Sequence, residues 1–159
     1  MNKNIIYIGS DHRGFELKQK IIDFLNAQNI QVIDCGNAIY DVNDDYPDYA
    51  AEVARKVVQD EDSLGIVICG TGVGVSIAAN KISGARAALL DKIETTAIAR
   101  AHNHINILAL SSALMTDEAV LDIVSTFIQT EPSYQDKHMR RVAKIAELEN
   151  NNTDYEIYN

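Results

Sequence analysis

Five short runs of apolar, mostly β-branched residues alternate with longer stretches of helical periodicity along this chain. These runs predict strands at 4–9, 30–35, 64–69, 85–90 and 106–110. The stretches between and after them predict helices at 14–28, 46–59, from a glycine loop to 81, 93–102, 116–130 and 133–148. Strands separated by helices pair in parallel and are covered on both faces. We therefore expect an α/β fold, a doubly wound (Rossmann-like) five-stranded parallel sheet with helices on both faces.

The length of 159 residues suits a single domain. We assign residues 1–149 to this domain and residues 150–159 to a polar C-terminal tail. The tail is expected to fray, and docking of Tyr155, Ile157 and Tyr158 on a partner is the alternative.

Charge and cysteine usage exclude several classes of function. Fourteen Lys and Arg against 23 Asp and Glu give a net charge of −9, which is unsuited to general nucleic-acid binding. No apolar run reaches the roughly 20 residues of a membrane helix. The N-terminus also lacks a signal-peptide pattern, so we expect a cytoplasmic protein that binds no membrane. Cys35 and Cys69 are too few for a disulfide framework, and no zinc-site spacing is present, so no metal is expected.

Two polar clusters follow predicted strands. Asp11 and His12 come after the first strand, and the run from Cys69 to Gly74 ends the third. Ligands of open α/β sheets bind beyond the carboxyl ends of the strands, so we expect these clusters to share a site. The third cluster, 102–104, precedes the fifth strand and is expected at the opposite edge of the sheet.

The glycine loop of residues 70–74 has neither the lysine of a Walker loop nor the spacing of a dinucleotide loop. Its free backbone amides would suit an oxyanion or a phosphate. A structural turn and an anion site remain equal alternatives on this pattern alone.

Several single residues have two interpretations each. Cys69 is either an inert buried thiol or a thiolate that acts as a general base, whereas Cys35 is interpreted as structural. Asp11 and His12 either cap a helix or hold sugar hydroxyls, and His102 could merely end its helix.

Basic residues gather in the last predicted helix of this acidic chain. Lys137 and Arg141 are four residues apart and share one helix face, which carries further basic residues nearby. This face is either simply solvated or binds an anion.

Taken together and in this order, the motifs resemble the ribose-5-phosphate isomerase B family, which also includes the galactose-6-phosphate isomerase subunits. The resemblance covers roughly residues 5–145, and its most specific block runs from Cys69 to Lys81. The other resembling stretches are 9–15, 45–47, 86–87, 101–103 and 138–142.

The resemblance implies an aldose–ketose isomerase that needs neither metal nor cofactor. Cys69 would move a proton between C1 and C2 of the sugar through a cis-enediolate. Thr71 and the loop amides would stabilise the developing oxyanion, and His102 would open the furanose ring. The loop glycines assigned to this role are Gly70, Gly72 and Gly74.

The resemblance also implies how a phosphorylated sugar is held. Asp11, His12, Tyr46 and Asn103 would bind hydroxyls or assist ring opening, and the phosphate would contact His12, Lys137 and Arg141. The family is dimeric and borrows the segment of His102 and Asn103 from the second subunit. We therefore expect a homodimer with shared active sites, or a tetramer built from such dimers.

Two positions depart from many ribose-type members, which have arginine where this chain has Ala113 and Lys137. Arg13 could supply the missing charge. Ribose 5-phosphate and ribulose 5-phosphate are therefore the leading substrate pair, and a hexose 6-phosphate such as allose or galactose 6-phosphate is the alternative. A non-catalytic sugar-phosphate-binding module is disfavoured because Cys69 and Thr71 are retained.

Overall fold

The computed structural model describes residues 5–150, so docking of the tail residues falls outside the described part of the chain. Its strands are β1 Ile6–Ser10, β2 Val32–Asp34, β3 Leu64–Cys69, β4 Ala87–Leu89 and β5 Ile107–Ser111. Its α-helices are α1 Phe15–Ala27, α2 Tyr46–Gln59, α3 Val73–Ala79, α4 Ile93–Asn103, α5 Asp117–Gln129 and α6 Asp136–Asn150. A short 3-10 helix, η1 (His12–Gly14), precedes α1. None of the helices in the described range is long and apolar enough to cross a membrane.

All strand pairs are parallel, and the strand order is β2-β1-β3-β5-β4. This confirms the predicted five-stranded parallel sheet. Strand β2 lies on one side of β1, and the next strand along the chain, β3, lies on the other side of β1. The carboxyl ends of β1 and β3 therefore form the switch point, where doubly wound folds place their ligands.

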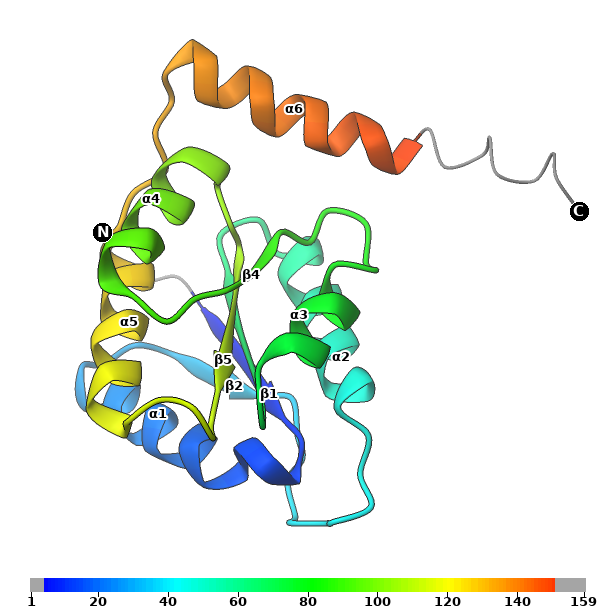
Figure 1. Cartoon of the computed structure of the whole chain (residues 1–159), viewed down its shortest axis with the longest axis vertical. Coiled ribbons are helices and arrows are strands. Elements are labelled where there is room, and N and C mark those ends of the chain that lie inside the picture. The colour runs from blue at the N-terminus through cyan, green and yellow to red at the C-terminus, as the bar shows by residue number, and fades with distance from the viewer. Residues whose placement is uncertain (1–4, 151–159) are drawn as a thin grey trace, which may run out of the picture.

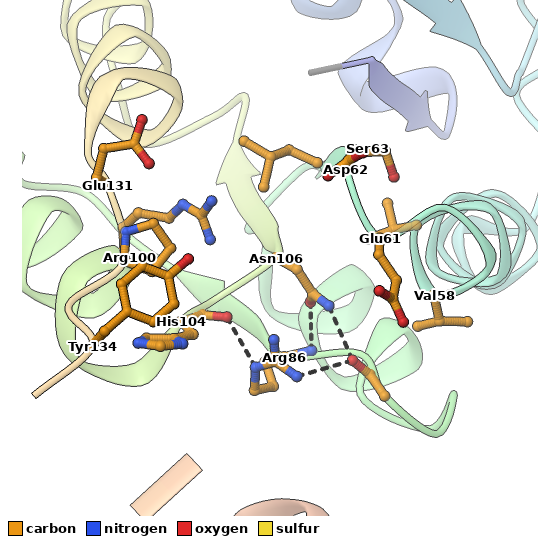
Figure 2. A pocket seen from close by; sticks show the side chains of 14 residues that line it. Val58, Glu61, Asp62, Ser63, Arg86, Arg100, His104, Asn106, Glu131 and Tyr134 are labelled. Atoms are coloured by element: carbon orange, nitrogen blue, oxygen red, sulfur yellow. Dashed lines mark hydrogen bonds between the residues drawn. The ribbon is translucent and has the colours of Figure 1, made fainter. Parts of the chain in front are cut away.

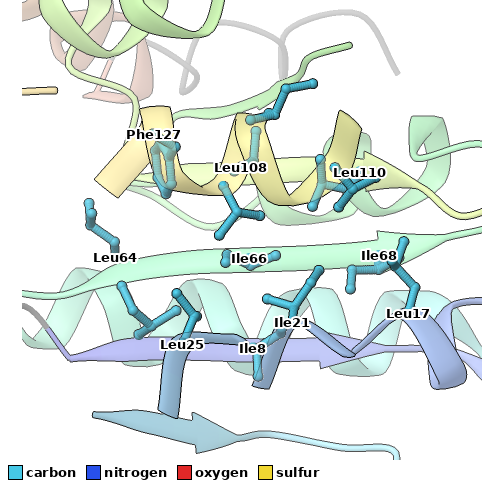
Figure 3. Packing of buried hydrophobic residues seen from close by; sticks show 14 of the residues in the cluster. Ile8, Leu17, Ile21, Leu25, Leu64, Ile66, Ile68, Leu108, Leu110 and Phe127 are labelled. Carbon is cyan, nitrogen blue, oxygen red and sulfur yellow. The ribbon is translucent and has the colours of Figure 1, made fainter. Parts of the chain in front are cut away.

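Helices cover both faces of the sheet, as expected (Figure 1). Helices α1 and α5 pack on one face, where Ile21 and Phe127 belong to the same buried cluster as Ile66 of the central strand β3 (Figure 3). Helices α2 and α3 pack on the other face through Val53 and Val75. Every residue of β3 is buried, which explains its uninterrupted apolar run.

The predicted and observed boundaries agree best in the centre of the sheet. The bounds of α2 and β3 are those predicted, and Pro47 lies in the first turn of α2. The edge strands β2 and β4 have only three residues each and are shorter than predicted. Each edge strand pairs on one side only, so fewer ladder hydrogen bonds extend it.

Helix α6 begins three residues later than predicted. The backbone before it is held to the end of α4, because the Ser133 amide donates to the Ala101 carbonyl at 2.8 Å. The helix then runs across the top of the domain in the view of Figure 1, above β4. Near its far end, Glu149 accepts hydrogen bonds from the Ser83 hydroxyl and the Gly84 amide.

Candidate active site

Asp11 follows β1 directly, and its side chain is buried at the carboxyl edge of the sheet. Its Oδ1 atom accepts hydrogen bonds from the amides of Arg13 (3.0 Å) and Gly14 (3.2 Å), which caps η1. Burial raises the pKa of Asp11, although the Gly14 amide and His12 oppose this shift. The cap interpretation of Asp11 is therefore confirmed, and its second oxygen remains available at the site.

Cys69 ends β3 and is 5% exposed. The Gly72 amide donates a hydrogen bond to its Sγ atom at 3.2 Å, so this loop amide is bonded to the sulfur. Gly72 has a φ of 77°, and a Cβ atom there would lie 2.9 Å from the backbone carbon of Leu110. This turn therefore requires glycine.

The amides of Gly70, Thr71 and Gly74 have no hydrogen-bond partner among residues 5–150. The carbonyl groups in this region are, in contrast, held by the residues that follow β5. The amides of Ser112 and Ala113 donate to the carbonyls of Cys69 and Gly70, each at 3.0 Å. The carbonyls of Cys69 and Gly70 are thus hydrogen-bonded, whereas the three loop amides named above are free to donate to a ligand. This is the arrangement of an oxyanion site.

Sequence reasoning missed Ser111, whose buried hydroxyl donates to the Gly70 carbonyl at 2.7 Å. This contact joins residues 41 positions apart, so no local pattern could have indicated it. Ala113 lies in the same segment, which places this departure from the family pattern beside the glycine loop.

Arg13 and Tyr46 flank the glycine loop. A Cβ atom at Gly70 would collide with the Arg13 guanidinium, and one at Gly74 would collide with the Tyr46 ring. The carboxyl edge thus brings together Asp11, Arg13, Tyr46, Cys69 and the loop, and the clusters that follow β1 and β3 meet as predicted.

His12 lies in the same cluster and contacts Asp44, another residue that the sequence did not single out. Nδ1 of His12 and Oδ1 of Asp44 are 2.7 Å apart, and the His12 amide donates to the same oxygen at 3.0 Å. Asp11, His12 and Asp44 offer ligand atoms within 4.8 Å of one another. Because His12 and Asp44 already bond to each other, a metal is not needed to explain this cluster.

Four other predicted site residues lie elsewhere in the chain. His102 and Asn103 end α4, and Lys137 and Arg141 lie on α6; all four are exposed. The end of α4 precedes β5, so these residues lie at the edge opposite Cys69 (Figure 1). A single chain therefore does not unite the two groups.

His138 is a further residue that the sequence did not assign to the site. Its ring stacks on that of His102, with centroids 4.1 Å apart, and its buried Nδ1 has no partner in the described structure. Burial lowers the pKa of His138, and the neighbouring charges of His102, Lys137 and Arg141 lower it further.

A polar cavity of about 680 Å³ lies where β3 and β5 begin, at the edge of the sheet opposite Cys69 (Figure 2). Its two arginines are held by backbone carbonyls: Arg86 Nε donates to His104 and Arg100 Nη1 donates to Ile105, both at 2.9 Å. These contacts fix the turn between α4 and β5. The cavity contains none of the predicted site residues.

Cys35 fits its structural interpretation. It is half-buried, and burial together with the carboxylates of Glu52 and Asp34 raises its pKa to about 11. Its thiol is therefore protonated at neutral pH, unlike the reactive thiols found in electropositive surroundings.

Comparison with known proteins agrees with this geometry. A family model described as Ribose/Galactose Isomerase matches residues 6–145. Ribose-5-phosphate isomerase B of Mycolicibacterium paratuberculosis is 46% identical over 144 residues, covering 91% of each chain. The crystal structure of ribose-5-phosphate isomerase B from Mycoplasma genitalium with bound ribulose-5-phosphate superimposes with a TM-score of 0.88 at 44% identity, covering 92% of this chain and 97% of that one. The ribose-5-phosphate isomerase B of Clostridium thermocellum gives a TM-score of 0.89 at 43% identity, covering 94% and 99%.

Proposed function

The chain belongs to the ribose/galactose isomerase family, and we propose that it interconverts ribose 5-phosphate and ribulose 5-phosphate. The relative from Mycoplasma genitalium was solved with bound ribulose-5-phosphate and covers nearly the whole of this chain. The observation that carries the proposal is the Cys69 sulfur beside a glycine loop with unpaired amides. Such a pair offers a base and an oxyanion site within one turn of the backbone.

In the proposed reaction the Cys69 thiolate accepts the C2 proton of the open-chain aldose. The C2–H electron pair forms the C1–C2 double bond, and the carbonyl pair moves onto O1 to give a cis-enediolate. The amides of Gly70 and Gly74 and the Thr71 hydroxyl stabilise this charge, a task worth about 3–4 kcal/mol per donor. Return of the proton to C1 and a shift of the O2 proton to O1 complete the ketose.

The remaining residues of the carboxyl edge would hold and open the sugar. Asp11 and His12 lie close enough together to bind neighbouring hydroxyl groups. Tyr46 borders the loop at Gly74, and Arg13 borders it at Gly70, where its charge would attract the phosphate.

We further propose that two copies of the chain share each active site. His102, Asn103, Lys137 and Arg141 would come from the second subunit, with His102 opening the ring and the two basic residues binding the phosphate. The separation of these residues from Cys69 within one chain supports this arrangement. Exposed apolar side chains on α3 and α6 support it too, since Val73, Ile77 and Ile145 are 49%, 57% and 42% exposed.

We place the enzyme in the cytoplasm, working without a metal or cofactor. Its two free cysteines suit a reducing compartment. The thiol base and amide donors described above supply the groups that the proton transfer requires.

A hexose 6-phosphate is the second candidate substrate. The observation in its favour is Ala113, which lies beside the glycine loop and has a short side chain where the family resemblance implies arginine. Lys137 is a point donor where arginine would give a bidentate grip. Both changes concern the phosphate end of the substrate.

A substrate panel followed by proton NMR in deuterated water tests the proposal. Ribose, allose, galactose and arabinose phosphates are compared with free ribose as the control. We expect fast conversion of ribose 5-phosphate with deuterium entering at the migrating position. Turnover of a six-carbon phosphate alone would transfer the proposal to the second candidate, and no turnover by the folded protein would reject isomerase activity.

A further inference from the structure

Asp44 lies in the loop before α2, and its carboxylate is almost fully enclosed. Its side chain is 4% exposed, although the neighbouring Asp45 is exposed and makes no side-chain hydrogen bond in the described structure. Both oxygens of Asp44 have partners. Oδ1 contacts Nδ1 and the amide nitrogen of His12, and Oδ2 accepts from Nδ2 of Asn37 at 2.6 Å.

These contacts determine which nitrogen of His12 carries its proton. An ionised carboxylate has only acceptors, so Nδ1 must donate to Asp44. Asp44 Oδ1 then holds the His12 ring through Nδ1 at 2.7 Å and the His12 backbone through its amide at 3.0 Å. Nε2 makes no hydrogen bond to a residue in the described range, so it is the nitrogen left for a ligand.

Asp44 is itself held by a chain of contacts that begins inside the domain. The fully buried Lys18 donates to the Asn37 carbonyl at 2.6 Å and to the Asp34 carboxylate at 2.7 Å. The Asn37 amide donates to the Ser10 carbonyl at 2.9 Å, which ties this loop to the end of β1. Asn37 therefore presents its side chain to Asp44 from a fixed position.

We propose that Asp44 is a positioning residue that fixes the tautomer and orientation of His12 for substrate binding, with Asn37 as its support. This inference rests on the proposed isomerase function. Carboxylates that accept from one ring nitrogen of a metal-bound or catalytic histidine fix its tautomer and orientation, and Asp44 would do the same for His12.

The decisive variant is Asp44→Asn. Asp44 accepts a hydrogen bond through each of its two oxygens, whereas the asparagine side chain has one acceptor oxygen and one NH2 donor. Its NH2 group would therefore face a donor of either His12 or Asn37. We expect KM for ribose 5-phosphate to rise about tenfold, as for loss of one hydrogen bond to a charged group, with kcat changed much less. Asp45→Asn is the matched control and should leave both constants unchanged. Asn37→Ala should raise KM by a smaller factor.

A double-mutant cycle separates positioning from general damage to the fold. If Asp44 acts through His12, Asp44→Asn should change KM little in a His12→Ala background. Equal increases of KM in both backgrounds would overturn the proposal. Thermal unfolding of each variant shows that the compared proteins are folded.

Nitrogen-15 NMR of the ligand-free protein gives a readout that is independent of turnover. We expect His12, assigned with a His12→Gln variant, to have a protonated Nδ1 that Asp44→Asn shifts toward the other tautomer. An unprotonated Nδ1 in the wild type, or no change in the variant, would overturn the proposal. If no sugar phosphate reacts, the isomerase function fails while this measurement still decides the role of Asp44.

Discussion

The imidazole rings of His102 and His138 stack with their centroids 4.1 Å apart and their planes inclined by 13°. His102 is exposed at the end of α4, whereas His138 is buried on α6. The stack is therefore a direct side-chain link between α6 and the end of α4. It also packs His102, the proposed ring-opening group, against a buried ring.

The first prediction concerns the pH dependence of this link. Burial, aided by nearby positive charge, lowers the pKa of His138 below its ordinary value of 6.5. The unfolded chain then binds the proton more readily, so the contribution to stability is complete above about pH 6.5 and is lost as the pH falls below it. We expect His138→Gln to lose less unfolding free energy than the wild type between about pH 7.5 and 5.5.

Urea denaturation at matched protein concentrations measures this difference. Parallel curves of stability against pH for the two proteins would contradict the assignment to His138.

The second prediction concerns the proposed base. Cys69→Ala removes one small side chain and should fold normally, but it should lower kcat/KM by about 10²–10⁴-fold, the range for loss of a general base. Initial rates with ribose 5-phosphate provide the measurement. Cys35→Ala is the control and should keep full activity, because Cys35 is a protonated thiol outside the site. Near-wild-type turnover in Cys69→Ala would reject the base assignment.

The third prediction compares two glycines with positive φ. Gly72→Ala forces a Cβ atom to within 2.9 Å of the Leu110 backbone in a left-handed conformation. We expect it to lose about 2–3 kcal/mol of stability and most of its activity, because the loop amides must move. At Gly84, φ is 85° but the nearest contact is Val58 at 3.3 Å. Gly84→Ala should therefore cost about 1–2 kcal/mol and keep kcat.

Chemical denaturation and initial rates on the two variants separate strain from loss of function. Equal losses of activity in the two variants would contradict the assignment of the activity loss in Gly72→Ala to displaced loop amides.

The fourth prediction compares two lysines on α1. Lys18 is fully buried and pairs with Asp34, whose side chain is 34% exposed. Lys18→Met leaves the Asn37 carbonyl without its donor and the carboxylate unpaired, so we expect a loss of about 3 kcal/mol, at the lower end for a broken buried pair. Lys20→Met, which removes an exposed pair with Asp117, should change little. Equal unfolding free energies for the two variants would contradict this.

Sequence reasoning predicted those parts of the fold that depend on local pattern. The bounds of α2 follow from Pro47 and helical periodicity, and those of β3 follow from burial on both faces. Strand order and the late start of α6 depend on contacts between distant segments, such as that of Ser133 with Ala101.

The site residues likewise fall into those that local pattern could predict and those that depend on distant partners. Asp11 and Cys69 could be predicted because each ends a strand at the switch point. Asp44 and Ser111 could not, because they act through partners 32 and 41 residues away. Lys18 did give a signal, since it shares the buried face of α1 with Ile21 and Leu25, where a charge demands a partner.

The last prediction tests the shared active site. Cys69→Ala and His102→Ala each inactivate every site of their own homodimer if His102 acts on the partner's substrate. After subunit exchange, a mixed dimer has one site with both defects and one intact site. Random mixing should then restore about a quarter of the wild-type activity per subunit.

The two inactive variants are mixed at equal concentration, exchanged under mild denaturant and assayed for isomerisation, with each variant treated alone as the control. A recovery near a quarter requires that Cys69 and His102 of one site come from different chains. If the two residues acted within one chain, every site in the mixed dimer would carry one defect and the mixture would remain inactive.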